Sequence, residues 1–156
     1  MIYGNVNDGN MIVFIRMVDK LRMCPVIDHG NNLLQPVNGR DLGKGYYQLL
    51  CKNEIMSGDY ILSGDRARTM LEIFRLISNK LGKKTAFVSV RLGLGVSMAR
   101  CLRLVTLNRM DYVEKVQRMG EDRSFSHEAA ARDFGYEPMS FEEGLGIEIE
   151  EYLRRT

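Results

Sequence analysis

The segment that begins at Ser126 constrains the fold most strongly, because signals for the start and the end of helices follow one another in it at short spacing. Ser126 is a good N-cap and Gly135 a good C-terminal stop, and three consecutive alanines lie between them, which predicts a short helix over 127–134. Pro138 then favours an extended connection. The residues from Ser140 to Glu143 have the pattern of a capping box, so a second helix is expected to begin there.

The rest of the chain alternates between helical and strand periodicity. Helices are expected over residues 9–22, 41–52, 69–81, 96–107 and 110–119, and strands within residues 1–8 and over residues 25–28, 59–62 and 85–90. Elements that alternate in this way predict an α/β fold with a small sheet.

Several polar residues and glycines near the expected helix starts are predicted to cap a helix or to allow close packing. Asp8 and Asp41 are interpreted as N-caps of the helices that follow them, and Asp41 as a cap rather than a ligand group. Residues 69–72 form a second capping box. Gly43 and Gly45 each cost a helix about 1 kcal/mol relative to alanine, and glycines at these positions are expected to permit close backbone packing.

Length and composition limit the class of protein. A chain of 156 residues with 45% hydrophobic and 27% charged residues is expected to form one domain over residues 1–156, or to be a fragment of one. No apolar run of about 18 residues and no signal-peptide pattern occurs, so no membrane partner is expected. Cys24, Cys51 and Cys101 are far apart, which is typical of reduced, mostly buried thiols in a cytoplasmic protein. The two histidines do not provide a clustered metal site.

The net charge of +2 conceals an asymmetry along the chain. Residues 1–120 hold 18 Lys and Arg against 10 Asp and Glu, whereas residues 121–156 hold 4 against 10. A basic body suits an anionic ligand, but the same distribution is expected if an acidic C-terminal helix packs against a basic face. Nucleic-acid binding is not expected, because the basic stretch around Arg91, Arg100 and Arg103 lacks interleaved exposed aromatics.

Several motifs occur in a recognisable order. An acid-x-aromatic segment is followed by a short helix that ends in aromatic-Gly-Tyr-x-Pro, and then by a Ser-x-x-Glu-Gly cap. The matching residues are Asp122 to Phe125, Phe134 to Pro138 and Ser140 to Gly144, preceded by Ile2 to Gly4, Asp8 to Met11, Pro25 to Ile27, Gln35 to Val37, and Asp41 with Leu42. In these segments the chain resembles the extended short-chain dehydrogenase/reductase family, the NAD(P)-dependent nucleotide-sugar epimerases and dehydratases. The resemblance covers nearly the whole chain but only the C-terminal half of such an enzyme. It implies helices around a small sheet, without the N-terminal Rossmann half.

The catalytic and cofactor-binding signatures of that family are absent. Its enzymes use a Tyr-x-x-x-Lys pair, in which the lysine lowers the pKa of the tyrosine so that it can remove a hydroxyl proton. None of the seven tyrosines here is followed four residues later by lysine. The best approach to a dinucleotide-binding loop has Gly93 and Gly95 but Met98 at the third glycine position. The chain alone is therefore expected to bind no cofactor and to be inactive, whereas its intact parent would use NAD or NADP.

The resemblance also implies a binding site for a nucleotide-diphosphate sugar. In the family this half supplies arginines to the diphosphate, since a planar guanidinium forms bidentate bonds to phosphate. Arg123 and Arg118 match that role by their place in the motif. Asn10 and Met11 lie where the family's substrate loop becomes a helix, and Arg40 lies in a segment that closes over the nucleotide. A plain surface ion pair with one of the two acidic residues before it is the alternative for Arg123.

These expectations lead to one function and one alternative from another class. The chain is interpreted as the substrate-binding C-terminal portion of a nucleotide-sugar epimerase, dehydratase or reductase, whose missing Rossmann half would pass a hydride between nicotinamide and a sugar carbon. The alternative is a stand-alone binding or regulatory module without catalysis, for an anionic ligand or a protein partner. A chain without the family's central sheet exposes apolar surface, so self-association is expected as well.

Overall fold

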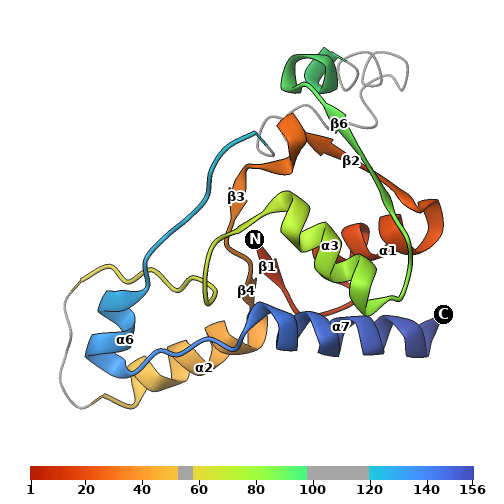
Figure 1. The fold of residues 1–156 in the computed structure, drawn as a ribbon. Helices are drawn as coiled ribbons and strands as arrows, with labels where there is room; N and C mark the ends of the chain where they lie inside the picture. Colours follow the sequence, from red (N-terminus) through yellow and green to blue (C-terminus); the bar gives the residue numbers. More distant parts are fainter. Residues whose placement is uncertain (53–57, 98–119) are drawn as a thin grey trace, which may run out of the picture.

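Three two-stranded sheets with helices around them make up residues 1–52, 58–97 and 120–156, which the computed structural model describes (Figure 1). The strands are β1 (Ile2–Tyr3), β2 (Met23–Ile27), β3 (Leu33–Leu34), β4 (Val37–Asn38), β5 (Arg68–Thr69) and β6 (Ala86–Val90). The helices are α1 (Met11–Leu21), α2 (Gly39–Leu50), α3 (Met70–Lys80), α6 (Glu128–Phe134) and α7 (Phe141–Arg155), with the 3-10 helix η1 (Asp28–Gly30). The predicted α/β class is confirmed.

The strands pair across long stretches of sequence. β1 lies parallel to β4, with Ile2 opposite Val37, and β2 lies parallel to β6 with Val26 opposite Ser89. β3 and β5 are antiparallel. Because each pair joins segments that are distant in the chain, the three pairs fix the positions of the helices that connect them.

The strand expected over residues 59–62 does not form. These residues follow an irregular path, and the partner of β3 is β5, further along the chain. Tyr60 and Leu62 pack instead on a small cluster built on α6, where the rings of Tyr60 and Phe134 meet edge to face at 5.1 Å. Side-chain packing, rather than strand pairing, therefore buries the alternating apolar residues of this segment.

The main core lies where α1, α3 and α7 pack together. The predicted apolar stripe of α1 is buried at Met11, Phe14, Ile15 and Val18, but Leu21 is exposed in the last turn, where the helix ends. The residues that α3 and α7 add are Met70, Ile73, Phe74, Ile77, Phe141, Leu145, Ile149 and Tyr152.

The predicted starts of α3 and α7 are confirmed. The Glu72 amide donates to Thr69 Oγ1 at 3.2 Å and the Thr69 amide donates to the Glu72 carboxylate at 2.8 Å, which completes a capping box. At α7 the Glu143 amide donates to Ser140 Oγ at 3.2 Å, so this half of the second box is present. α6 ends at Gly135 in the left-handed conformation, with φ of 74°, as the sequence predicts.

Three predicted N-caps are wrong. α6 begins after His127, which makes no side-chain cap, and the hydroxyl of Ser126, one residue further back, accepts from the Glu128 amide at 3.2 Å. α1 begins after Asn10, and Asp8 accepts a hydrogen bond of 2.7 Å from the Asn10 amide in the preceding loop. α2 begins after Asn38, which has the extended backbone of an N-cap and accepts from an amide of the first turn at 3.0 Å. Asp41 consequently lies inside the helix, where it is buried and accepts from the Met139 amide at 3.1 Å.

α2 and α6 approach each other closely at Gly45. A Cβ at this position would lie 2.9 Å from the ring of Tyr136, so a larger residue would clash. Ala130, Phe134 and Tyr136 form the second, smaller core at this contact. Gly45 thus permits close packing, but against the side chains of Tyr136 and Leu62 rather than against a backbone, and a Cβ at Gly43 would meet nothing within 4 Å.

Some sequence predictions fall outside the described residues, namely the helix over 110–119, most of the helix over 96–107, and Cys101. Cys24 is buried as expected, but Cys51 is exposed at the end of α2, contrary to the prediction of mostly buried thiols. Within the part of the chain that the structure describes, no helix is both long enough and apolar enough to cross a membrane.

Gly64→Ala should destabilise the fold, because a Cβ at this buried position would overlap the backbone carbonyl of Pro36. Overpacking of this kind costs about 1–3 kcal/mol. Gly43→Ala is the matched control: its methyl group meets nothing within 4 Å in a helix interior, so it should raise the free energy of unfolding by roughly 1 kcal/mol. Urea denaturation measures both variants, and equal effects would contradict the packing described here.

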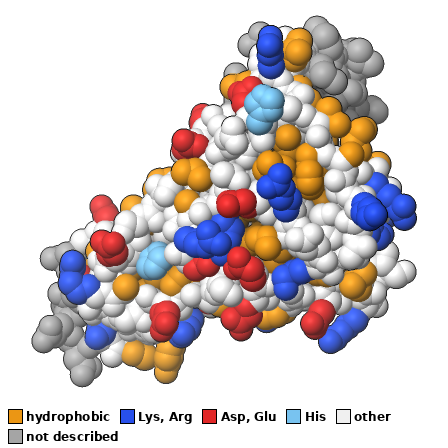
Figure 2. All heavy atoms as spheres, viewed as in Figure 1, with side chains coloured by type: hydrophobic (Ala, Val, Ile, Leu, Met, Phe, Trp, Pro, Cys, Tyr) orange, Lys and Arg blue, Asp and Glu red, His pale blue; other side chains and the backbone are white. Residues whose placement is uncertain are grey.

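The isolated chain should associate as its concentration rises. Hydrophobic side chains reach the surface in patches on the face drawn in Figure 2, and Leu50 at the end of α2 is 83% exposed. β1 has a single strand neighbour, β4, among the described strands, so no second strand covers its other edge there. Open edges and apolar patches favour association. Sedimentation velocity over a concentration series measures it, and Leu50→Glu should shift the chain toward monomer. A monomer at every concentration would refute this expectation.

Candidate functional site

Residues 120–127, here called the strap, are bound along β3 through backbone groups. The Arg123 amide donates to the Leu33 carbonyl at 2.7 Å, and the Leu33 amide donates to the Asp122 carboxylate at 2.8 Å. At the start of the strap, the side-chain amide of Asn32 donates to a backbone carbonyl at 2.9 Å. These bonds fix the main chain around Arg123 independently of its side chain.

The Arg123 side chain has an acidic neighbour. Its guanidinium pairs with Glu121 at 3.1 Å, as the simpler interpretation of the sequence allows, and the Glu121 side chain is 64% exposed. Burial and, after it, the charge of Arg123 lower the pKa of the Met1 amine. Exposed ion pairs contribute little to stability, so an anionic ligand could replace Glu121 at Arg123.

The other predicted binding residues are not joined to Arg123 by any contact among the described residues. Arg40 is exposed in the first turn of α2. The side-chain amide of Asn10 donates to a carbonyl of β1 at 3.2 Å and ties α1 to that strand. Met11 is a core residue with 0% of its surface exposed. Arg118 lies outside the described residues, and the binding roles of all these side chains stay predictions.

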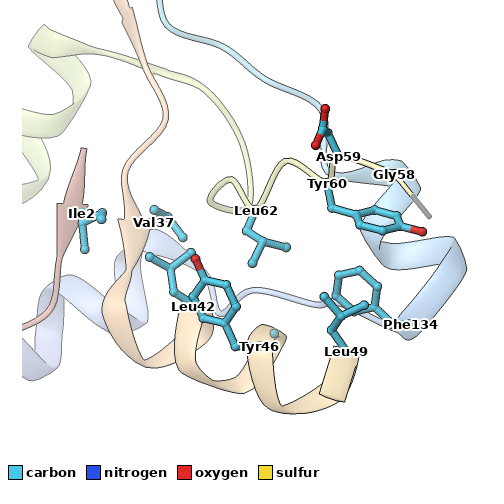
Figure 3. Close-up of a pocket in the computed structure, with 11 residues that line it drawn as sticks. Ile2, Val37, Leu42, Tyr46, Leu49, Gly58, Asp59, Tyr60, Leu62 and Phe134 are labelled. Atoms are coloured by element: carbon cyan, nitrogen blue, oxygen red, sulfur yellow. The ribbon is translucent and has the colours of Figure 1, made fainter. Parts of the chain in front are cut away.

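An open groove of about 440 Å³ lies between α2, α6 and the segment over residues 58–62 (Figure 3). Its lining includes Ile2, Val37, Leu42, Tyr46, Leu49, Leu62 and Phe134, so it reaches from the α2–α6 contact to the paired strands β1 and β4. Tyr60 also lines it, and the Tyr60 hydroxyl donates to Asp133 at 3.0 Å. The groove suits an apolar group, but this lining holds no nucleophile paired with a base.

Ser63 and His127 have the separation of a nucleophile and its base, but their hydrogen bonds give them a structural role. Ser63 Oγ lies 2.9 Å from His127 Nδ1 and donates its hydrogen to the Phe125 carbonyl at 2.9 Å. Since a hydroxyl has one hydrogen, Nδ1 must donate to Ser63 and cannot take its proton. Gln35 donates to Ser63 Oγ at 3.0 Å and accepts from the Phe125 amide at 2.7 Å. This cluster binds the strap to the loop before β5, and it leaves His127 partly buried.

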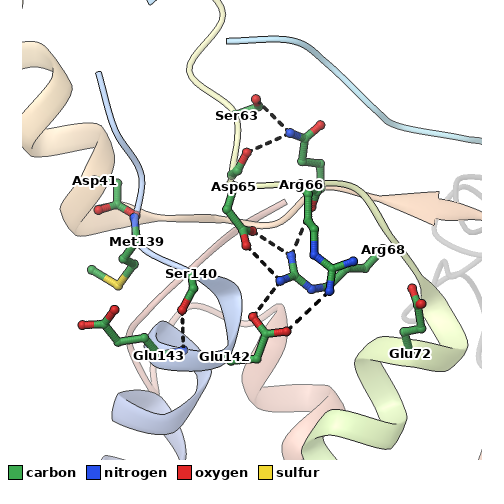
Figure 4. A network of polar contacts seen from close by, with 12 residues as sticks. Asp41, Ser63, Asp65, Arg66, Arg68, Glu72, Met139, Ser140, Glu142 and Glu143 are labelled. Atoms are coloured by element: carbon green, nitrogen blue, oxygen red, sulfur yellow. Dashed lines mark hydrogen bonds and ion pairs between the residues drawn. The ribbon is translucent and has the colours of Figure 1, made fainter. Parts of the chain in front are cut away.

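A buried ion-pair network beside this cluster centres on Arg68 (Figure 4). The Arg68 side chain is 1% exposed, and its guanidinium bonds both oxygens of Asp65, at 2.7 and 2.9 Å, and one oxygen of Glu142 at 2.7 Å. Its Cζ atom lies 5.1 Å from the centre of the Phe141 ring. Burial acts to raise the pKa of Asp65, but hydrogen bonds led by that from Arg68 outweigh it, and the pKa is lowered. The network holds the loop before β5 against the first turn of α7.

Glu148 of α7 is a buried carboxyl with an incomplete set of partners. The Gly4 amide donates to Oε2 at 2.9 Å, whereas Oε1 is buried and has no hydrogen-bond partner in the described part of the chain. Burial, and then the charge of Asp8, raise the pKa of Glu148 to about 7. The carboxyl is thus poised to change charge near neutral pH, directly beneath the turn that follows β1.

Arg68, Ser63 and Glu148 were not found from the sequence. For Glu148 a signal was present, because Leu145 and Tyr152 lie three residues before and four residues after it, on the buried stripe of α7. Arg68 and Ser63 carry no such signal, since their partners come from other elements. Among the described residues, no three His, Cys, Asp or Glu side chains are placed to hold one metal ion.

Neither the models of known sequence families nor the sequences of curated proteins match this chain. Solved structures do match. UDP-glucuronic acid 4-epimerase from Bacillus cereus, solved with UDP-glucuronic acid and NAD, superposes with a TM-score of 0.70 over 100% of this chain and 44% of that one, at 14% identity. dTDP-glucose 4,6-dehydratase from Bacillus anthracis, solved with NAD, superposes with a TM-score of 0.66 over 99% of this chain and 42% of that one, at 17% identity. UDP-glucose 4-epimerase from Thermotoga maritima, solved with UDP-glucose, superposes with a TM-score of 0.66 over 99% of this chain and 44% of that one, at 17% identity.

The chain thus spans less than half the length of these structures. At such low identity the likeness establishes a fold, namely one that this chain shares with part of the NAD-dependent epimerases and dehydratases of the extended short-chain dehydrogenase type. The fold implied by the sequence motifs is confirmed at that level.

The free energy of unfolding should fall as the pH rises from about 5 to about 8. The pKa of Glu148 is about 7 in the fold against an ordinary value of 4.5, so the folded state holds a proton that the unfolded state has released over this range. A difference of this size corresponds to roughly 3 kcal/mol. Glu148→Gln keeps an acceptor for the Gly4 amide but does not titrate, so it should lose this part of the pH dependence and be the more stable form above pH 7. Urea denaturation of both forms across this range is the measurement. Parallel pH profiles would contradict the burial of an ionisable carboxyl here.

Proposed function

We propose that this chain is the substrate-binding, C-terminal portion of an NAD(P)-dependent nucleotide-sugar epimerase, dehydratase or reductase. One observation carries the proposal: the whole chain superposes on less than half of several such enzymes, two of which were solved with a UDP-sugar. Because a shared fold does not by itself fix a function, the proposal also depends on the chemistry of the strap.

The diphosphate of the nucleotide sugar would bind at Arg123. The main chain of this residue is already fixed to β3 through Leu33, so little conformational freedom is lost when its guanidinium binds an anion. A diphosphate offers bidentate, charge-assisted bonds that outcompete the exposed carboxylate of Glu121. Arg118 is the second proposed diphosphate ligand. Asn10 and Arg40 would contact the rest of the nucleotide sugar, and Met11, which is fully buried, would support that part of the site from the core.

NAD or NADP does not fit this chain by itself. The three spaced glycines of a dinucleotide loop are lacking, since Met98 stands at the third position, and no tyrosine has a lysine four residues later. We therefore assign the hydride transfer to the Rossmann half of the intact parent, and only the hold on the substrate to this chain. A cytoplasmic location accords with the free thiols of Cys24 and Cys51.

UDP-glucose and UDP-glucuronic acid should bind to the purified chain, and Arg123→Ala should weaken that binding about tenfold or more. The loss of a charge-assisted hydrogen bond to phosphate costs about 1.5–3 kcal/mol, which sets this factor. Isothermal titration calorimetry measures it. Arg154→Ala is the matched control, because Arg154 is an exposed arginine at the end of α7. Equal binding by the two variants would show that Arg123 does not hold the diphosphate.

A second candidate function is a stand-alone binding or regulatory module without catalysis. The absence of both the Tyr-x-x-x-Lys pair and the dinucleotide loop favours it. The mass of the native protein in its source cells separates the two candidates. A species of about 17.9 kDa would support the module, and a species of about twice that mass or more would support the intact oxidoreductase.

A further inference from the structure

A second cavity, here called the α3 pocket, lies away from the strap and has a volume of about 360 Å³. Its lining residues are Val26, His29, Leu71, Arg75, Phe87 and Ser89. None of them belongs to the proposed nucleotide-sugar site. Like the groove, the pocket is open to solvent, and its volume lies at the small end of the range for ligand pockets.

The floor of the α3 pocket is one face of the β2–β6 pair. Val26 is opposite Ser89 in the parallel register, and Phe87 lies two residues before Ser89, so all three side chains point to the same face of the sheet. Leu71 and Arg75 are four residues apart on α3 and therefore share the face of the helix that forms the wall. Arg75 on the wall and Phe87 and Val26 on the floor therefore line the same pocket.

The end of the pocket is a turn held in an unusual conformation. His29 has a φ of 64° and its neighbour Asp28 a φ of 44°, both in the left-handed region that non-glycine residues rarely adopt. The His29 amide donates to Ser89 Oγ at 3.0 Å, and the Leu92 amide donates to Asp28 Oδ1 at 3.1 Å. Gly30 packs against Leu71 at the base of the turn, where a Cβ would lie 3.0 Å from the leucine side chain. The pocket is therefore formed before any ligand enters, which lowers the cost of binding.

The polar groups of the pocket all suit a negative charge. Ser89 Oγ accepts from the His29 amide, so its hydrogen is left to donate to a ligand. Among the described residues no carboxylate forms an ion pair with Arg75, and His29 also lines the pocket. Phe87, Val26 and Leu71 offer apolar surface to the rest of the ligand.

We propose that the α3 pocket binds a small planar organic anion, in which an aromatic ring lies on Phe87 and a phosphate or carboxylate group is held by Arg75, His29 and Ser89. A ligand that carries both a ring and an anionic group can use both the apolar surface and the donors of the pocket. An inorganic anion or a purely apolar solute can use only one of the two.

Phenyl phosphate is the probe, with inorganic phosphate standing for its anionic half and benzyl alcohol, a neutral aromatic alcohol, for its ring half. Changes in the amide NMR spectrum of the full chain should show saturable binding of phenyl phosphate at residues of β2, β6 and α3. Each half alone should bind at least tenfold more weakly. Arg75→Ala should weaken phenyl phosphate binding about tenfold, and Arg154→Ala should leave it unchanged.

The proposal is overturned if inorganic phosphate binds as tightly as phenyl phosphate, if benzyl alcohol does so, or if Arg75→Ala has no more effect than Arg154→Ala. Arg75 is exposed on α3, so its replacement by alanine should leave the fold intact, and the NMR spectrum reports this directly. The proposal stands or falls separately from the nucleotide-sugar site: Arg75→Ala should retain UDP-glucose binding, and Arg123→Ala should retain phenyl phosphate binding.

Discussion

The structure depends above all on the enclosure of one charge, the guanidinium of Arg68. A cation that is 1% exposed is stable only if carboxylates compensate for the water it has lost. Asp65 supplies both of its oxygens from the preceding loop, and Glu142 supplies one from the first turn of α7. These bonds set the path of the loop, the start of α3 just after β5, and the position of α7 against both. Loss of either carboxylate would leave a buried, partly unpaired charge, so the three segments are held to one arrangement.

The strap is attached to this framework through a second set of polar contacts. Ser63 lies just before Asp65 in the loop, and it binds His127 and the Phe125 carbonyl at the end of the strap. The middle of the strap is bound to Leu33 of β3. Arg123 therefore projects from a backbone that is fixed at two places, while its side chain pairs with the exposed Glu121. This is the arrangement that a binding residue requires, because its position is set by the fold and its hydrogen-bonding groups stay available.

Local signals in the sequence were sufficient to predict where a helix begins or ends when neighbouring residues set that boundary. The capping box at Thr69 and the stop at Gly135 depend on contacts within four residues, and both form as predicted. The predictions fail where the conformation or the contacts of a residue depend on a partner that is distant in the sequence. The apolar alternation over residues 59–62 is typical of a strand, but α6 buries Tyr60 and Leu62 by side-chain packing. Aspartate is a residue type that often caps helices, but Asn38 caps α2 in place of Asp41. The Asp41 carboxylate instead accepts a hydrogen bond from the amide of Met139, which lies 98 residues further along the chain.

The sequence by itself determined the α/β class, the main helix boundaries, the resemblance of the C-terminal motifs, and the lack of a Tyr-x-x-x-Lys pair, because all of these are patterns among residues close together in the chain. Only the tertiary structure decided which polar groups become buried and what they contact. The bond between Gly4 and Glu148 spans 144 residues, and the α3 pocket joins β2, β6, η1 and α3. Such sites arise from the packing of whole elements, whose relative positions depend on many weak contacts at once and leave no short pattern in the sequence.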